Sequence, residues 1–223
     1  MAGSDASAGT SAGTSAADFV PETNSLEELR EASAGCRGCE LWEAATQTVF
    51  SAGPRKARVA LVGEQPGDVE DQQGKPFVGP AGRLLVEAVD EAGIPREVLY
   101  RTNAVKHFRF TQAGPGKRRI HQTPELRHIV ACKPWLAAEL VLVHPEVVVC
   151  LGATAVRSLL GTQVRVMRDR GAILERETSL GTTAFLVTVH PSAVLRADDR
   201  DKAYAALVAD LRVVADRLGT PAS

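Results

Sequence analysis

Short apolar runs alternate with amphipathic segments along this chain. Residues 58–62, 98–105, 146–151 and 185–189 form runs that are too short for helices and are typical of buried strands. Apolar residues at helical spacing predict helices at 25–35, 80–92, 123–140, 152–160 and 202–218. Residues 171–175 are expected to form an antiparallel or edge strand. This alternation predicts an α/β fold, a three-layer α/β/α sandwich around a mostly parallel four-stranded sheet.

Composition sets the outer limits of the domain. The first 18 residues are rich in Ala, Gly, Ser and Thr, so we expect a disordered tail at 1–18 and a single domain at 19–219. No apolar run reaches 18 residues and no signal-peptide pattern is present, so the sequence predicts a soluble, cytoplasmic protein without membrane contact. The formal net charge is −1, so nucleic-acid binding would require a local basic patch.

Four cysteines suggest a metal site. Cys36 and Cys39 form a C-x-x-C pair, and Cys132 and Cys150 lie 18 positions apart. Without a secretory signal, disulfides are disfavoured. Zinc and iron–sulfur sites both use four thiolates, and the wide second spacing suits a [4Fe–4S] cluster better than a zinc ribbon. The alternative is four unconnected buried cysteines.

Three loops follow predicted strands, where ligands bind in parallel sheets: GEQPGD from Gly63, NAVKHF from Asn103, and HPSAVLR from His190. The first loop carries polar groups, and Phe77 beyond it offers a flat apolar face. Asn103 presents a donor and an acceptor together, which reading a nucleobase edge requires. Ordinary turn formers and capping residues are the alternative interpretation.

Basic residues gather between positions 106 and 119 and lead to a histidine. Lys106 and Arg109 are followed by the sequence GPGKRRIH, which ends at His121. In a protein with net charge near zero, this cluster is a candidate nucleic-acid contact. The alternative is a solvated charged loop.

These segments together resemble a known family. GEQPG, GKPFVGPAGRLL, TNAVKHF, ACKPWL, VVVCLGATA and VTVHPSAVLR are similar to the iron–sulfur uracil-DNA glycosylases of family 4, over about residues 25–218. The KRRIH loop resembles the UdgX branch, whose members excise uracil and stay covalently joined to DNA through the loop histidine. The resemblance implies a uracil-DNA glycosylase fold and a [4Fe–4S] cluster on Cys36, Cys39, Cys132 and Cys150.

The resemblance also implies roles for individual residues. Uracil would be flipped out of the stack. The residues implied to bind it are Gly63, Gln65, Phe77 and Asn103, with a supporting role for Asp68. His190 would donate to uracil O2 as negative charge develops, and Glu64 would stabilise the sugar cation or accept a proton from the nucleophile. An unperturbed histidine is mostly neutral above pH ~6.5, so His121 would attack C1′ in place of water.

The implied partner is uracil-containing DNA, with single strands preferred, free uracil as product and the protein as a monomer. The implied DNA contacts are Lys106, Lys117, Arg118, Arg119, Ser192 and Arg196; Arg119 and its neighbours would hold either the loop or the phosphates. Two alternatives stay open. The protein would otherwise be a multi-turnover glycosylase whose basic loop only grips DNA, or a binding module without catalytic activity.

Overall fold

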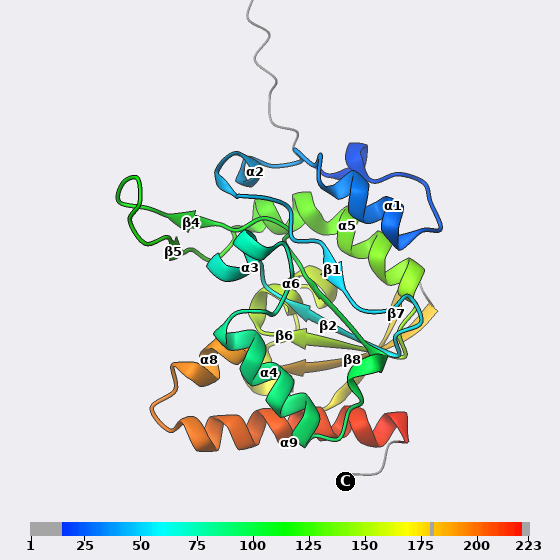
Figure 1. The fold of residues 1–223 in the computed structure, drawn as a ribbon. Helices are drawn as coiled ribbons and strands as arrows, with labels where there is room; N and C mark the ends of the chain where they lie inside the picture. The colour runs from blue at the N-terminus through cyan, green and yellow to red at the C-terminus, as the bar shows by residue number, and fades with distance from the viewer. Residues whose placement is uncertain (1–14, 179–180, 220–223) are drawn as a thin grey trace, which may run out of the picture.

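The computed structural model describes residues 15–178 and 181–219. Within these ranges a six-stranded sheet has the strand order β1-β3-β2-β6-β8-β7 (Figure 1). Its four inner strands are parallel, as expected, and two antiparallel edge strands extend them. The bounds are β1 Ser51–Ala52, β2 Val59–Gly63, β3 Leu99–Asn103, β6 Val147–Leu151, β7 Ile173–Thr178 and β8 Gly181–Thr188.

Helices cover both faces of this sheet (Figure 1). Both faces of the sheet are apolar, as the side chains of β6 show by pointing alternately to its two faces. Val147, Val149 and Leu151 pack into one apolar core, while Val148 and Cys150 pack into the other. The first core is covered by α4 (Pro80–Glu91), α8 (Pro191–Leu195) and α9 (Arg200–Leu218), and the second by α5 (Leu126–Val143) and α6 (Ala153–Leu160). The α/β/α sandwich is therefore confirmed. The other helices are η1 Ala17–Phe19, α1 Leu26–Ser33, α2 Leu41–Ala44, α3 Asp68–Gln73, η2 Arg96–Val98 and α7 Val166–Asp169.

Helix starts agree with the sequence at some positions and differ at others. Ser25 caps α1 as expected, since its hydroxyl accepts from the Glu28 N–H at 3.3 Å. The long helix α5 was expected from residue 123 but begins at Leu126. Glu125 is its N-cap, and the Glu125 N–H donates to His128 Nδ1 at 2.9 Å, which leaves the preceding proline outside the helix.

The N-terminal boundary also needs correction. Residues 1–14 of the expected tail lie outside the described residues, but residues 15–18 pack on the domain. Ala16 is buried, and its N–H donates to the Ala131 carbonyl on α5 at 2.8 Å. None of the helices in the described part of the chain is long and apolar enough to cross a membrane.

The basic loop is a β-hairpin. β4 (Phe110–Thr111) pairs antiparallel with β5 (Ile120–His121), and the hairpin projects beyond the carboxyl ends of the parallel strands (Figure 1). The Lys117 N–H donates to the Gly114 carbonyl at 3.1 Å, and Gly116 takes a positive φ of 72° in the connecting turn. His121 therefore lies on a paired strand at the base of the hairpin and faces Phe110 in the register.

Candidate active site

A groove of about 1010 Å³ opens where the parallel strands end and the hairpin begins. Register places the loops together, since Gly63 at the end of β2 pairs with Asn103 at the end of β3. The rule that ligand loops follow parallel strands therefore finds the groove correctly. Many of the residues that the sequence predicted for the site line this groove. They are Glu64, Gln65, Asp68, Phe77, Arg118, Arg119, His121, His190, Ser192 and Arg196.

Glu64 and His121 meet in this groove although 57 positions separate them. The His121 Nε2 atom lies 3.3 Å from Glu64 Oε1, and their side chains are 46% and 21% exposed. The other carboxylate oxygen, Oε2, accepts a hydrogen bond from the Thr154 hydroxyl at 2.5 Å. On its other side the His121 ring packs against Phe108, with 5.9 Å between ring centroids. The carboxylate is thus positioned to take a proton from the imidazole.

His190 is held as a neutral donor. Its Nδ1 accepts from the Ser192 N–H at 3.2 Å and lies 2.8 Å from the Ser192 hydroxyl, so the ring proton belongs on Nε2. Burial, with smaller contributions in the same direction from His121 and Arg196, lowers the pKa of His190 to about 4. The imidazole therefore stays uncharged at neutral pH. Ser192, expected at the DNA, orients this ring.

Phe77 and Asn103 come together over a glycine. A Cβ built on Gly63 would lie 2.8 Å from the Phe77 ring and would collide with Asn103 Oδ1, so only glycine leaves space for both side chains. Phe77 has a positive φ of 59°, which costs about 1–3 kcal/mol for a bulky residue. Strain of this kind marks a side chain whose position is imposed by its surroundings.

Glu70, which the sequence analysis missed, holds the strained Phe77 segment. Its carboxylate accepts from the Gly67 N–H, and the backbone N–H groups of Phe77, Val78 and Gly79 also bind it. Burial raises its pKa, and these backbone donors oppose the rise. The one sequence signal was the capping-box spacing of Gly67 and Glu70.

Gln65 uses its side chain to fasten the hairpin. Its Nε2 donates to the carbonyl oxygens of Arg109 and Gln122, both at 3.1 Å, and its Oε1 accepts from the Arg109 N–H at 3.0 Å. These two residues flank the hairpin at either end. The amide of Gln65 is therefore engaged in structure, and its backbone is the part left to line the groove.

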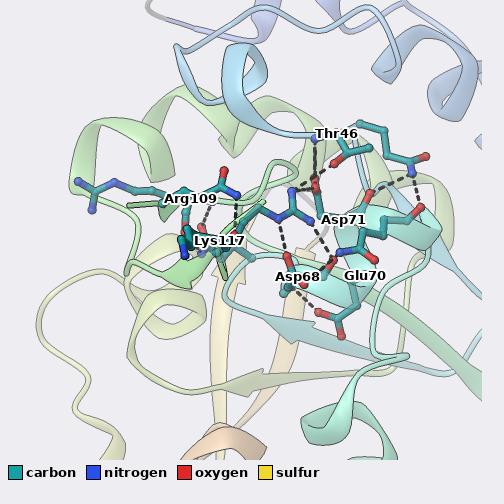
Figure 2. Close-up of polar contacts among 12 residues, drawn as sticks. Thr46, Asp68, Glu70, Asp71, Arg109 and Lys117 are labelled. Carbon is teal, nitrogen blue, oxygen red and sulfur yellow. Dashed lines mark hydrogen bonds and ion pairs between the residues drawn. The ribbon is translucent and has the colours of Figure 1, made fainter. Parts of the chain in front are cut away.

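Arg119 anchors the hairpin to α3. Its guanidinium forms ion pairs with Asp68 and with Asp71 (2.6 Å to Oδ2), and only 13% of its side chain is exposed. Asp71 is fully buried and also accepts from the Thr46 N–H at 3.1 Å. Figure 2 shows Thr46, Asp68 and Asp71 gathered in this network. Phe108 and Phe110 stack on the guanidinium, with distances of 5.3 and 4.9 Å to their ring centroids.

Arg119 was expected to hold either the loop or the DNA phosphates. Its ion pairs with Asp68 and Asp71 hold the loop. Asp68 likewise pairs with this arginine, and it also lines the groove. Asp71 had no sequence signal, because its partner is 48 positions away. Arg118 and Lys117, by contrast, are exposed.

Comparison with known proteins agrees with this geometry. A family model described as the uracil DNA glycosylase superfamily matches residues 50–212. The chain belongs to this superfamily. A type-4 uracil-DNA glycosylase of Thermotoga maritima is 37% identical over 172 residues, which cover 77% of this chain and 83% of that protein. The proteins of the same name from Archaeoglobus fulgidus and Pyrobaculum aerophilum are 34% and 33% identical over 175 residues each, covering 77% of this chain and 83% and 85% of those proteins.

In this superfamily member, Lys106, which was expected at the DNA, lies inside the protein instead. It is fully buried, and its Nζ lies 2.5 Å from Glu139 Oε2, 2.6 Å from the Thr102 hydroxyl and 2.9 Å from the Asn103 carbonyl oxygen. The Tyr100 hydroxyl also donates to Glu139. Lys106 turns inward because a buried carboxylate requires a partner charge.

Three of the four expected cluster ligands lie together, and the fourth does not. Cys36, Cys39 and Cys132 belong to one apolar cluster, where the Trp135 indole N–H donates to Cys36 Sγ at 3.2 Å and the Lys106 N–H donates to Cys132 Sγ at 3.3 Å. Burial, opposed by Lys106 and aided by the neighbouring Cys39 and Cys36, raises the pKa of Cys132 to about 12.

Cys150 lies elsewhere, inside β6, and packs in the core beneath α5 and α6. Across the described ranges, no group of three or more His, Cys, Asp or Glu side chains is arranged to hold a metal ion. Cys150 is therefore a core residue of the sheet and does not join the other three cysteines as the expected fourth ligand.

Proposed function

We propose that this protein excises uracil from DNA and then becomes covalently joined through His121 to C1′ of the abasic sugar, as in the UdgX branch. The observation that carries the proposal is the 3.3 Å approach of His121 Nε2 to Glu64 Oε1 inside the groove. The names of the relatives support the first half of the reaction, since all three are type-4 uracil-DNA glycosylases. The hairpin that carries His121 into the groove supports the second step, covalent attachment to C1′.

Binding requires the base to leave the helical stack, which costs least in single-stranded DNA. Phe77 stacks on the flipped uracil, and the Asn103 amide pairs with its polar edge. The backbone at Gly63 and Gln65 lines the same pocket. The basic residues Lys117, Arg118 and Arg196 contact phosphates around it. One chain supplies all these groups, so the protein acts as a monomer.

Cleavage breaks the bond between C1′ and uracil N1, and the electron pair leaves with the base. His190 donates its Nε2 proton as a hydrogen bond to uracil O2 and stabilises that charge. C1′ gains positive character, which the Glu64 carboxylate stabilises. The Nε2–H bond of His121 then breaks: its proton passes to Glu64 Oε1, and its electron pair forms the bond to C1′. After the departed uracil anion takes up a proton from solvent, the products are free uracil and a neutral N-alkylated imidazole, a poor leaving group.

The test mixes the protein with a single-stranded oligonucleotide that carries one uracil and resolves the mixture on a denaturing gel. We expect a band at the combined mass that survives heat and detergent, and its loss in His121→Ser with free uracil still released. The same oligonucleotide with thymine is the control. Alkali-labile DNA without a shifted band would instead indicate the multi-turnover glycosylase, and neither product would indicate a binding module.

Arg119→Met is expected to slow adduct formation by about 100-fold at saturating DNA, since misplacing a nucleophile by about 1 Å has that effect. The substitution leaves the buried Asp71 without its partner charge and frees the hairpin from α3. Single-turnover gel kinetics measure the rate.

Arg118→Met is the matched control, because Arg118 is the exposed neighbour. It should weaken DNA affinity and lower the salt dependence of binding, while the rate at saturation stays unchanged. If Arg119→Met behaved like this control, the anchoring role would be contradicted.

A further inference from the structure

We propose that Thr154 is a positioning residue that fixes the Glu64 carboxylate for attack at C1′; this inference rests on the function proposed above. Thr154 is the second residue of α6, is 5% exposed, and donates its hydroxyl hydrogen to Glu64 Oε2 at 2.5 Å. Glu64 Oε1 lies 3.3 Å from His121 Nε2. The two carboxylate oxygens thus have separate partners.

This division of partners orients the carboxylate. A glutamate side chain has three rotatable torsions and, at the edge of an open groove, would sample several of them. The hydroxyl bond holds one oxygen, so the other stays directed at the imidazole that must lose its proton. Orientation of this kind accounts for large factors in enzymatic rates, because reacting atoms must already lie close together and aligned.

The position of Thr154 is itself well fixed. The Gly152 N–H donates to the Thr188 carbonyl at the end of β8, at 2.9 Å, which ties the start of α6 to the sheet. Gly152 has a φ of 84°, and a Cβ built there would lie 2.9 Å from His190 Cβ. The start of α6 therefore packs directly against His190, and the first turn of the same helix holds Glu64 through Thr154. A site on a packed helix is more precise than one on a loop.

The test compares Thr154→Val, which keeps the shape and loses the donor, with Thr154→Ser, which keeps the donor. Ser158→Ala is the control, because this buried hydroxyl lies one turn along α6 and has no hydrogen-bond partner among the described residues. Single-turnover rates of adduct formation and uracil release are measured at saturating DNA. DNA affinity and the thermal midpoint are measured beside them.

We expect Thr154→Val to slow adduct formation about 10- to 100-fold, the effect of losing a hydrogen bond to a charged group. DNA affinity and thermal midpoint should stay near wild type, and Thr154→Ser and Ser158→Ala should react at the wild-type rate. A Thr154→Val rate equal to wild type would overturn the proposal. Equal slowing in the serine variant would overturn it too, since that result would make the methyl group responsible.

The products formed by the wild-type protein test the proposed function separately from the role of Thr154. If the wild type released uracil without an adduct, the covalent step would be wrong and Thr154 would be judged by uracil release alone. If the wild type gave neither product, both proposals would fall together. The reaction rate of each variant relative to that of the wild type therefore tests the role of Thr154. The products that the wild type forms test the proposed function.

Discussion

Replacing Lys106 with methionine is expected to lower the free energy of unfolding by about 3–5 kcal/mol, the cost of leaving a buried charge without its partner. Glu139 is fully buried, and Lys106 Nζ is the cation beside it, at 2.5 Å. Methionine fills similar space but donates no hydrogen bond to Glu139, Thr102 or the Asn103 carbonyl. Urea unfolding at neutral pH measures the change.

The loss of unfolding free energy in Lys106→Met should also depend on pH. Burial raises the pKa of Glu139, and Lys106 opposes that rise. In the variant the opposition is gone, so folded Glu139 binds a proton at pH values where the unfolded carboxyl has released it. Stability then rises as pH falls toward the ordinary carboxyl range. The variant should therefore recover part of its deficit in mild acid, by more than the wild type gains.

Two further variants separate charge loss from packing. Adding Glu139→Gln to Lys106→Met removes the stranded charge and leaves an acceptor for Tyr100 and Thr102, so much of the stability should return. Lys133→Met, at an exposed position on α5, should change stability by about 0.5 kcal/mol or less. Loss of DNA affinity by Lys106→Met at unchanged stability would restore the original DNA-contact interpretation.

The buried position of Lys106 could not be predicted from the sequence. The sequence places it among basic residues, and nothing local reveals that Glu139, 33 positions later, needs a buried cation. The same limit applies to Cys150. Its distance along the chain from Cys132 suited a cluster ligand, but the period of two in β6 turns its side chain into the core beneath α5 and α6.

The fold was more accessible to prediction than the site contacts. Largely apolar runs marked β2, β6 and β8, because those strands are buried on both faces, whereas β3 carries Arg101, Thr102 and Asn103 among its five residues. The strands β1, β4 and β5 contain two residues each, too few for any period to show. The strand-end rule brought Glu64, Asn103 and His190 to one edge of the sheet. The meeting of His121 with Glu64 depends instead on hairpin pairing and on the Arg119 anchor, which involve distant residues.

Glu64→Gln is expected to slow both uracil release and adduct formation by about 10²–10⁴-fold, the usual contribution of a positioned base. Glutamine keeps the shape and an oxygen for the Thr154 hydroxyl. It has no negative charge to stabilise the sugar cation and is too weak a base to take the His121 proton. Glu97→Gln is the control, because Glu97 is exposed and precedes β3 at the opposite end of the sheet. Single-turnover kinetics with the uracil oligonucleotide follow both products.

Comparison of Glu64→Gln with His121→Ser separates the two tasks of the carboxylate. The serine variant should lose the adduct but keep uracil release, because bond cleavage precedes attack. Glu64→Gln should lose both, because the same group acts in both steps. Normal uracil release with a slow adduct would confine Glu64 to proton transfer from His121, and the sugar cation would then depend on other groups. Wild-type rates of both would remove Glu64 from the mechanism and leave its 3.3 Å contact with His121 a structural one.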